Sequence, residues 1–163
     1  MEFVQFEAES RAVSIGKPCR SLRKHHAAVS GIDVPLERNL QWNDDWSDRR
    51  QLEEYIRDVS GNFQGLNYGL VIDGKLAAVS LGTVRHWWEG TNYNIEEFCV
   101  DPGFQRNGIG SEFMGMIEEE IRKQGLAGIF LQTDKDKPSY HFYHKNGYKD
   151  LDMHVSLYKI IRE

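Results

Sequence analysis

The residues best suited to chemistry in this chain lie in the stretch QRNGIGS, residues 105–111. Two glycines spaced Gly-x-Gly follow an apolar run that ends at Asp101-Pro102, and a helical pattern comes next. The first turn of a helix carries N–H groups without partners, and its dipole makes that end partly positive. A glycine-rich loop there lets a phosphate or pyrophosphate approach the backbone, and Arg106 adds a permanent charge. An ordinary glycine turn is the alternative, since neither the Walker pattern nor the GxGxxG fingerprint is present.

Strand and helix patterns surround this stretch. Two β-rich runs flank Asp73-Gly74, a dipeptide that favours a tight hairpin turn, and TNYNIEEFCV predicts a further strand. SEFMGMIEEEIRKQ repeats apolar residues at helical spacing and meets Gly125 where a C-cap glycine belongs. Further along the chain we expect a buried strand in GIFLQT, a short helix in PSYHFYHKNGY and a last strand in MHVSLYKII. Together these patterns predict an α/β fold with a mixed sheet.

The first third of the chain gives weaker signals. EFVQFEAESRAVSIG alternates loosely and could contain a strand. CRSLRKHHAAVSG and WSDRRQLEEYIRDVSG predict two helices, of which the second has the better apolar face and a glycine after its end.

Composition limits the classes of function. With 163 residues, 40% of them hydrophobic, we expect a single domain over residues 1–163 with a substantial core. The formal net charge of −5 argues against nucleic acid as the main partner. No apolar run approaches the length that spans a bilayer, and the two cysteines, Cys19 and Cys99, form no CxxC pair. These features predict a reduced, cytoplasmic protein without a membrane partner.

The stretch from Ile95 to Tyr148 resembles the GCN5-related N-acetyltransferase (GNAT) family. FCVDPGFQRNGIG is similar to the family's strand and acetyl-CoA loop, and GIFLQT stands where the next strand should be. HFYHKNGY is similar to the family's Phe-Tyr-x-x-x-Gly-Phe pattern, with Tyr148 in place of the last phenylalanine. The resemblance implies an α/β fold with a mixed, centrally splayed β-sheet flanked by helices, and an acetyl-CoA-binding core over about residues 66–148.

The resemblance also implies which residues bind acetyl-CoA. Backbone amides of the loop would hold the pyrophosphate, and the strand before it would pair with the pantetheine arm as an added strand would. The loop residues are Gln105, Arg106, Asn107, Gly108, Ile109, Gly110 and Ser111, and the strand residues are Phe98, Cys99 and Val100. Asp136, Ser139 and Phe142 fall at further contact positions, where Asp136 and Ser139 replace the family's usual asparagine and alanine.

Acetyl transfer to an amine needs a base, because amines are largely protonated at neutral pH. The family often places this base on the strand before the loop, where this chain has Glu96 and Glu97. Strand alternation predicts that they face opposite sides of the sheet, so that only one can serve, and we favour Glu96. Either glutamate could instead be a solvated surface charge. Tyr143 matches the tyrosine that protonates the departing thiolate in many members, with a core tyrosine as the alternative.

These residues predict an acetyl-CoA-dependent N-acetyltransferase that acts on a primary amine of a small molecule, aminoglycoside-like compounds included, by direct ternary-complex transfer. A protein or peptide acceptor, a non-catalytic acyl-CoA-binding module and an unrelated nucleotide-binding domain are alternatives, and the oligomeric state, a homodimer included, stays open. The acidic residues and tryptophans of QWNDDWSD and HWWEG would suit a cationic acceptor. Alternatively, the acidic residues would be solvated and the tryptophans would lie in the core. His141 and His144 share a helix face without further ligands in register, so we expect no metal.

Overall fold

The computed structural model describes residues 1–6, 50, 54–55, 58, 61 and 64–161. Two compact units divide the chain, Met1–Gln132 and Thr133–Glu163. The helix predicted over residues 19–31 lies outside the described residues. Of the helix predicted over residues 46–61, the four residues Arg50, Glu54, Tyr55 and Asp58 are described with helical backbone.

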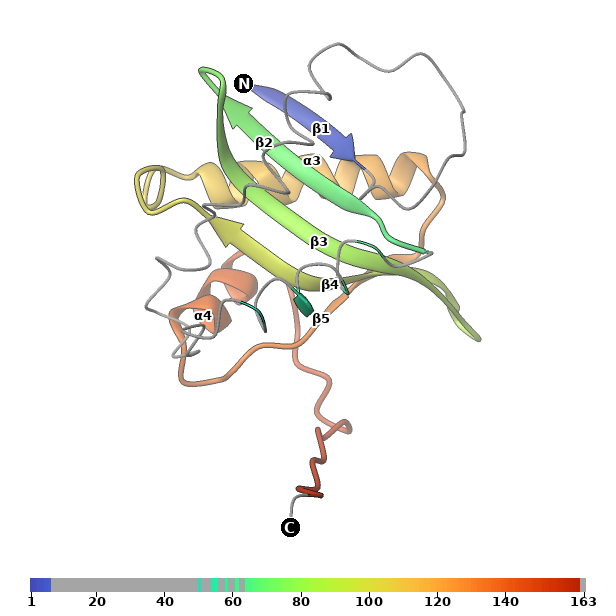
Figure 1. Cartoon of the computed structure of the whole chain (residues 1–163). Helices are drawn as coiled ribbons and strands as arrows, with labels where there is room; N and C mark the ends of the chain where they lie inside the picture. Colours follow the sequence, from blue (N-terminus) through green and yellow to red (C-terminus); the bar gives the residue numbers. More distant parts are fainter. Residues whose placement is uncertain (7–49, 51–53, 56–57, 59–60, 62–63, 162–163) are drawn as a thin grey trace. The chain divides into compact units, whose positions relative to one another are not determined.

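The first unit is built on a five-stranded mixed sheet (Figure 1). Its strands, in spatial and chain order, are β1 (Glu2–Phe6), β2 (Asn67–Ile72), β3 (Lys75–Trp87), β4 (Gly90–Val100) and β5 (Gly128–Leu131). The first four strands pair antiparallel with their neighbours, and β5 pairs parallel with β4. The predicted hairpin is confirmed at Asp73-Gly74, whose φ angles of 50° and 74° are those of a tight turn.

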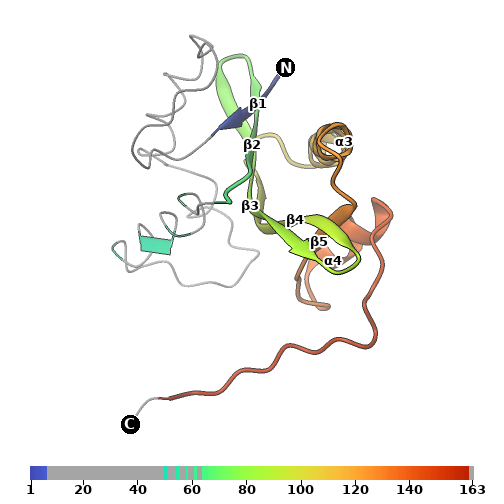
Figure 2. The ribbon, with the colours of Figure 1, turned by 90° about the vertical axis from the view of Figure 1, so that its right-hand side faces the viewer.

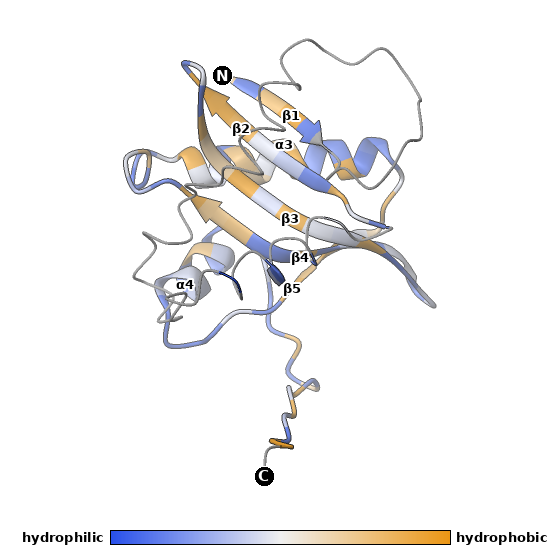
Figure 3. Ribbon diagram, in the orientation of Figure 1, coloured by the Kyte–Doolittle hydropathy of each residue, from blue (hydrophilic) through white to orange (hydrophobic). Residues whose placement is uncertain are grey.

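One long helix, α3 (Ile109–Lys123), covers one face of this sheet and contacts β3 and β4 (Figure 2). Its buried side chains, Phe113, Met114, Ile117 and Ile121, are those that recur at helical spacing. Phe113 stacks on Phe98 of β4, with ring centroids 5.5 Å apart. The helix therefore seals the core directly behind the end of β4, where the strand becomes hydrophobic (Figure 3). No helix among the described residues is long and apolar enough to cross a membrane.

A β-bulge interrupts the pairing of β3 with β4. Leu81 pairs with Glu97, but the next residue of β3, Gly82, pairs with Ile95, so that Glu96 is an extra residue on β4. A Cβ atom at Gly82 would lie 2.3 Å from the carbonyl oxygen of Asn94. Glycine at this position therefore permits a close approach of the two strands beside the bulge.

The sheet opens at β5. The parallel pairing of β4 with β5 covers Asn92–Ile95 and stops there, whereas β4 continues to pair with β3 up to Val100. The last five residues of β4 therefore have a strand on one side only among the described strands. This is the divergence that a centrally splayed sheet requires.

The second unit contains the helix α4 (Pro138–Lys145), which begins at its proline as predicted. The strand predicted in MHVSLYKII is not formed: residues 153–161 have no strand structure, and every side chain among them is exposed. Alternation of apolar residues predicts which side of a strand could be buried, but a strand also needs a neighbouring edge to pair with. None of the described strands pairs with these residues.

Candidate active site

The loop before α3 forms an open helix N-terminus. The N-cap residue is Gly108, with a φ of 82° and no side-chain cap, and the first intrahelical hydrogen bond runs from Glu112 N to Gly108 O at 3.0 Å. The amides of residues 109–111 therefore precede the intrahelical ladder and point out of the helix end. A Cβ atom added at Gly108 would have nothing within 4 Å, so no described atom crowds that side of the N-cap residue. A helix N-terminus of this kind is able to bind an anion.

Gln105 and Arg106 have different surroundings in the loop. The Gln105 side chain donates to the carbonyl oxygen of Val100 at 2.9 Å, which ties the loop back to the end of β4. Arg106 adopts a φ of 61°, in the left-handed region, and its side chain is exposed, as is that of Asn107. The side chain of Gln105 thus stabilises the loop, while that of Arg106 lies in solvent next to the helix end.

The backbone of Phe98, Cys99 and Val100 lies beyond the point where β5 stops pairing. Phe98 and Cys99 are buried, at 9% and 1% exposure, and the amide of Asp101, the residue after Val100, donates to the carbonyl oxygen of Ala77 of β3 at 2.8 Å. The side of β4 that faces away from β3 is the one at which an extended ligand could add as a strand.

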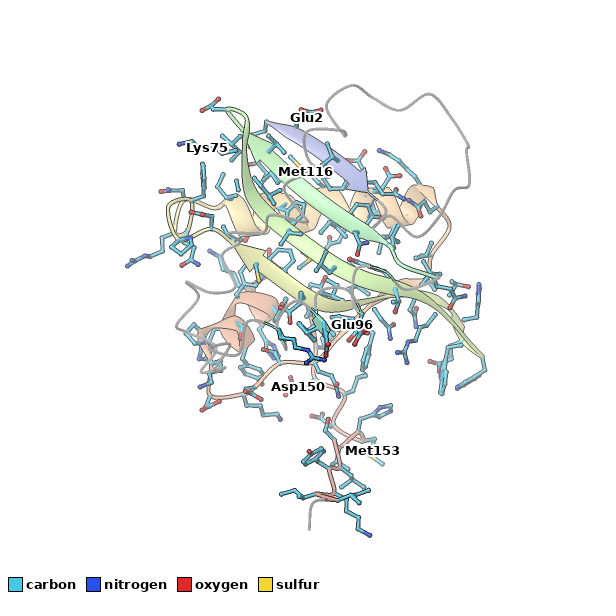
Figure 4. All side chains as sticks on the ribbon, viewed as in Figure 1. Glu2, Lys75, Glu96, Met116, Asp150 and Met153 are labelled. Carbon is cyan, nitrogen blue, oxygen red and sulfur yellow. The ribbon has the colours of Figure 1, made fainter. Side chains whose placement is uncertain are left out.

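Glu96 and Glu97 lie on the same face of the sheet, so the expectation that they face opposite sides is wrong. Ile95 and Phe98 pair with Gly82 and Ser80, which are two residues apart on β3 and share the face toward α3. The extra residue of the bulge leaves both glutamates between them on the opposite face. Glu96 is the glutamate labelled on β4 in Figure 4.

The two glutamates nevertheless have different surroundings. Glu96 is exposed, and one carboxylate oxygen lies 4.0 Å from a guanidinium nitrogen of Arg85, an exposed pair that is worth little energetically. Glu97 is half-buried and accepts a hydrogen bond from the hydroxyl of Tyr55. The thiol of Cys99 lies 3.8 Å from its other carboxylate oxygen. Glu97 is therefore the oriented carboxylate of the pair.

The groups around Glu97 stay neutral over a wide pH range. Burial, and then the negative charge of Glu97, raise the pKa of Tyr55 well above its usual range. The same two causes raise the pKa of the Cys99 thiol. Both groups therefore remain protonated and act as donors toward the carboxylate.

Tyr143 is buried on α4 in the second unit, with 6% exposure. Its ring lies edge-on to the rings of Phe142 and Tyr148, with centroids 5.2 and 5.6 Å away. Its carbonyl oxygen accepts a hydrogen bond of 3.1 Å from the backbone N–H of Tyr148, which ties the chain after the helix to the helix end. The side chain is thus held in a defined position within its unit.

The other contact positions predicted in this unit are also described. Ser139 shares a hydrogen bond of 2.8 Å with the hydroxyl of Thr133, and the carbonyl oxygen of Phe142 accepts from the side chain of Asn146 at 2.8 Å. Asp136 is exposed, and its carboxylate lies 3.9 Å from the ammonium of Lys137. This lysine offsets the negative charge that replaces the amide usual in the family.

Two of the weaker predictions can also be placed. Trp87 and Trp88, at the turn between β3 and β4, are 65% and 82% exposed and so are not core residues. Trp42 and Trp46 lie outside the described residues. His144 bonds to Asp150 at 3.0 Å, and the described part of the chain contains no group of three residues that could hold a metal.

Sequence reasoning missed Tyr55 and Gly82. Tyr55 lies 42 residues before Glu97 and reaches it only through the fold, so no local pattern could have found it. Gly82 did carry a signal, because an isolated glycine inside a strand pattern often marks a bulge or a close approach of another backbone.

Comparison with known proteins agrees with this architecture. A sequence model of the Acetyltransferase (GNAT) family matches residues 33–148. The chain therefore belongs to the GNAT family. It is 35% identical over 68 residues to the [Ribosomal protein bS18]-alanine N-acetyltransferase of Escherichia coli (strain K12), a match over 42% of this chain that spans 43% of the length of that relative.

Solved structures show the same fold at low identity. A ribosomal-protein-alanine N-acetyltransferase from Brucella melitensis biovar Abortus 2308 superimposes with a TM-score of 0.66 at 9% identity, over 98% of this chain and 100% of that one. An aminoglycoside N-acetyltransferase in complex with CoA gives a TM-score of 0.62 at 13% identity, over 98% of both chains.

Proposed function

We propose that this protein is an acetyl-CoA-dependent N-acetyltransferase that acetylates a primary amine of a small molecule by direct transfer. The observation that carries the proposal is the placement of Glu97. It is an oriented carboxylate on β4, two residues after the pairing with β5 ends and about a dozen residues before the open N-terminus of α3. The proposed base and the proposed anion site would thus both belong to the segment that runs from β4 into α3.

The described residues fit acetyl-CoA. The open amides of residues 109–111 and the charge of Arg106 suit a pyrophosphate, and the outer side of β4 suits the extended pantetheine arm. When bound, acetyl-CoA would supply the acetyl group as a reactive thioester. Lys137, beside Asp136, would limit the repulsion between that carboxylate and the phosphates.

Two residues of the chain would handle the protons. Glu97 would take a proton from the ammonium group of the acceptor, which frees the nitrogen lone pair for attack on the acetyl carbonyl carbon. As the carbon–nitrogen bond forms and the carbon–sulfur bond breaks, Tyr143 would donate a proton to the departing sulfur and regain one from water. A phenol, with an ordinary pKa near 10, is a suitable donor to a thiolate. Glu96, on the same face, would add negative charge that attracts a cationic amine.

The exposed tryptophans at the β3–β4 turn and the neighbouring Glu89 support a cationic acceptor. The named relatives act on different amines, an aminoglycoside in one case and the alanine of a ribosomal protein in the other. Both kinds of amine therefore belong in the test of this proposal.

The test is a screen of the full chain with acetyl-CoA against amines, scored by thiol release and by mass spectrometry for a gain of one acetyl group. Its arms are aminoglycosides, polyamines and other small primary amines, and a peptide that begins with alanine. We expect transfer to at least one small amine. Transfer to the peptide alone would replace the proposed acceptor class, and stabilisation by acetyl-CoA without any transfer would contradict the proposed activity.

A further inference from the structure

Tyr55 connects a remote part of the chain to the proposed base. It lies in the helical residues between β1 and β2, and its hydroxyl donates a hydrogen bond to one oxygen of Glu97, across a sequence separation of 42 residues. Because Glu97 faces away from α3, Tyr55 approaches the sheet from the side opposite that helix. The contact is therefore made on the face where the acceptor would lie.

The surroundings of this hydrogen bond strengthen it. Tyr55 and Glu97 are both half-buried, so the bond is partly shielded from water, and a hydrogen bond to a charged group is stronger than one between neutral groups. Among the residues that the structure describes, the charged and titratable groups that act on Tyr55 are Glu97, Glu96 and Cys99, and the charge of Glu96 is opposed by Arg85. Tyr55 and Cys99 stay neutral, so the donor is not lost by titration near neutral pH.

We propose that Tyr55 is a positioning residue for acetyl transfer: its hydroxyl holds one carboxylate oxygen of Glu97, which keeps the base charged and fixes its direction toward the acceptor amine. This inference rests on the proposed function. A glutamate has several rotatable bonds, and a base must lie within hydrogen-bond reach of the proton that it removes. Tyr55 fixes that geometry from outside the strand, so that a helical residue between β1 and β2 contributes to catalysis without touching either substrate.

Tyr55→Phe in the full chain tests the proposal, because it removes the hydroxyl and leaves the ring. Tyr68→Phe is the matched control: it removes a hydroxyl that bonds to Gln124 on the α3 side of the same sheet. With an amine found in the screen, we expect Tyr55→Phe to lower kcat about tenfold, to leave the KM for acetyl-CoA unchanged and to move the acid limb of kcat/KM up by about one pH unit. Tyr68→Phe should move none of these values.

A double-mutant cycle separates positioning from mere support of the fold. If Tyr55 acts through Glu97, then Tyr55→Phe should cause no further loss of kcat in a Glu97→Gln background. An equal loss in both backgrounds, or an acid limb that stays in place, would overturn the positioning role while leaving acetyl transfer established. A wild-type protein that transfers acetyl to no amine would instead remove the proposed function, and this inference with it.

If Tyr55→Phe does not fold, incorporation of 3-fluorotyrosine at position 55 keeps the hydroxyl and makes it a stronger donor. The acid limb should then move to lower pH, because a stronger donor favours the charged carboxylate. An unchanged acid limb in this variant would overturn the proposal.

Discussion

At the scale of single residues, Glu97 and Glu96 differ in environment although they share a face. Replacing Glu97 by glutamine removes the proposed base and keeps the size of the side chain. Because a positioned base contributes on the order of 10²–10⁴-fold to a proton transfer, we expect kcat to fall by a factor in that range. Steady-state kinetics with the best amine of the screen measures it, and a thermal shift with acetyl-CoA should show that cofactor binding is retained.

Glu96→Gln is the matched control for that substitution. The carboxylate of Glu96 is exposed and paired only loosely with Arg85, so its loss should alter the KM for a cationic amine far more than kcat. The reverse result, with kcat lost in Glu96→Gln and kept in Glu97→Gln, would return the role of base to the residue that the sequence alone favours.

At the scale of elements, the bulge decides how the glutamates are presented. An alanine at position 82 would put its Cβ atom 2.3 Å from the Asn94 carbonyl oxygen and 2.5 Å from the Tyr93 ring. Since a backbone oxygen cannot move without disturbing the ladder, we expect Gly82→Ala to lower the free energy of unfolding by about 1–3 kcal/mol, as overpacking does. Urea denaturation measures the change, and kcat should fall as well, because the bulge orients Glu97.

Gly115→Ala provides the opposite case in the same unit. Gly115 is an exposed residue within α3, and a Cβ atom there would have nothing within 4 Å. Alanine should therefore raise the free energy of unfolding by about 0.5–1 kcal/mol through its higher helix propensity. If the two alanine variants changed stability equally, close approach at Gly82 would not be the cause.

The same elements show what the sequence could and could not predict. The hairpin at Asp73-Gly74, the mixed sheet and α3 follow from local patterns, because turn chemistry and apolar periodicity act over a few residues. The bulge shifts the pairing of β4 by one residue, and such a shift reverses every prediction of side-chain direction beyond it. The failure of MHVSLYKII to form a strand has a similar cause, because strand pairing depends on a distant edge that local alternation does not reveal.

At the scale of the whole molecule, stability should depend on pH through Cys99, which is 1% exposed. Burial, then Glu97, raise the pKa of this thiol above its ordinary 9.0, so the native state keeps the proton that the unfolded chain loses. The contribution is intact below pH 9.0, and the free energy of unfolding then falls by about 1.4 kcal/mol per pH unit as pH rises. Urea denaturation should show this slope flattening in Cys99→Ala and persisting in Cys19→Ala. A slope unchanged by Cys99→Ala would mean that the native thiol ionises as readily as the unfolded one.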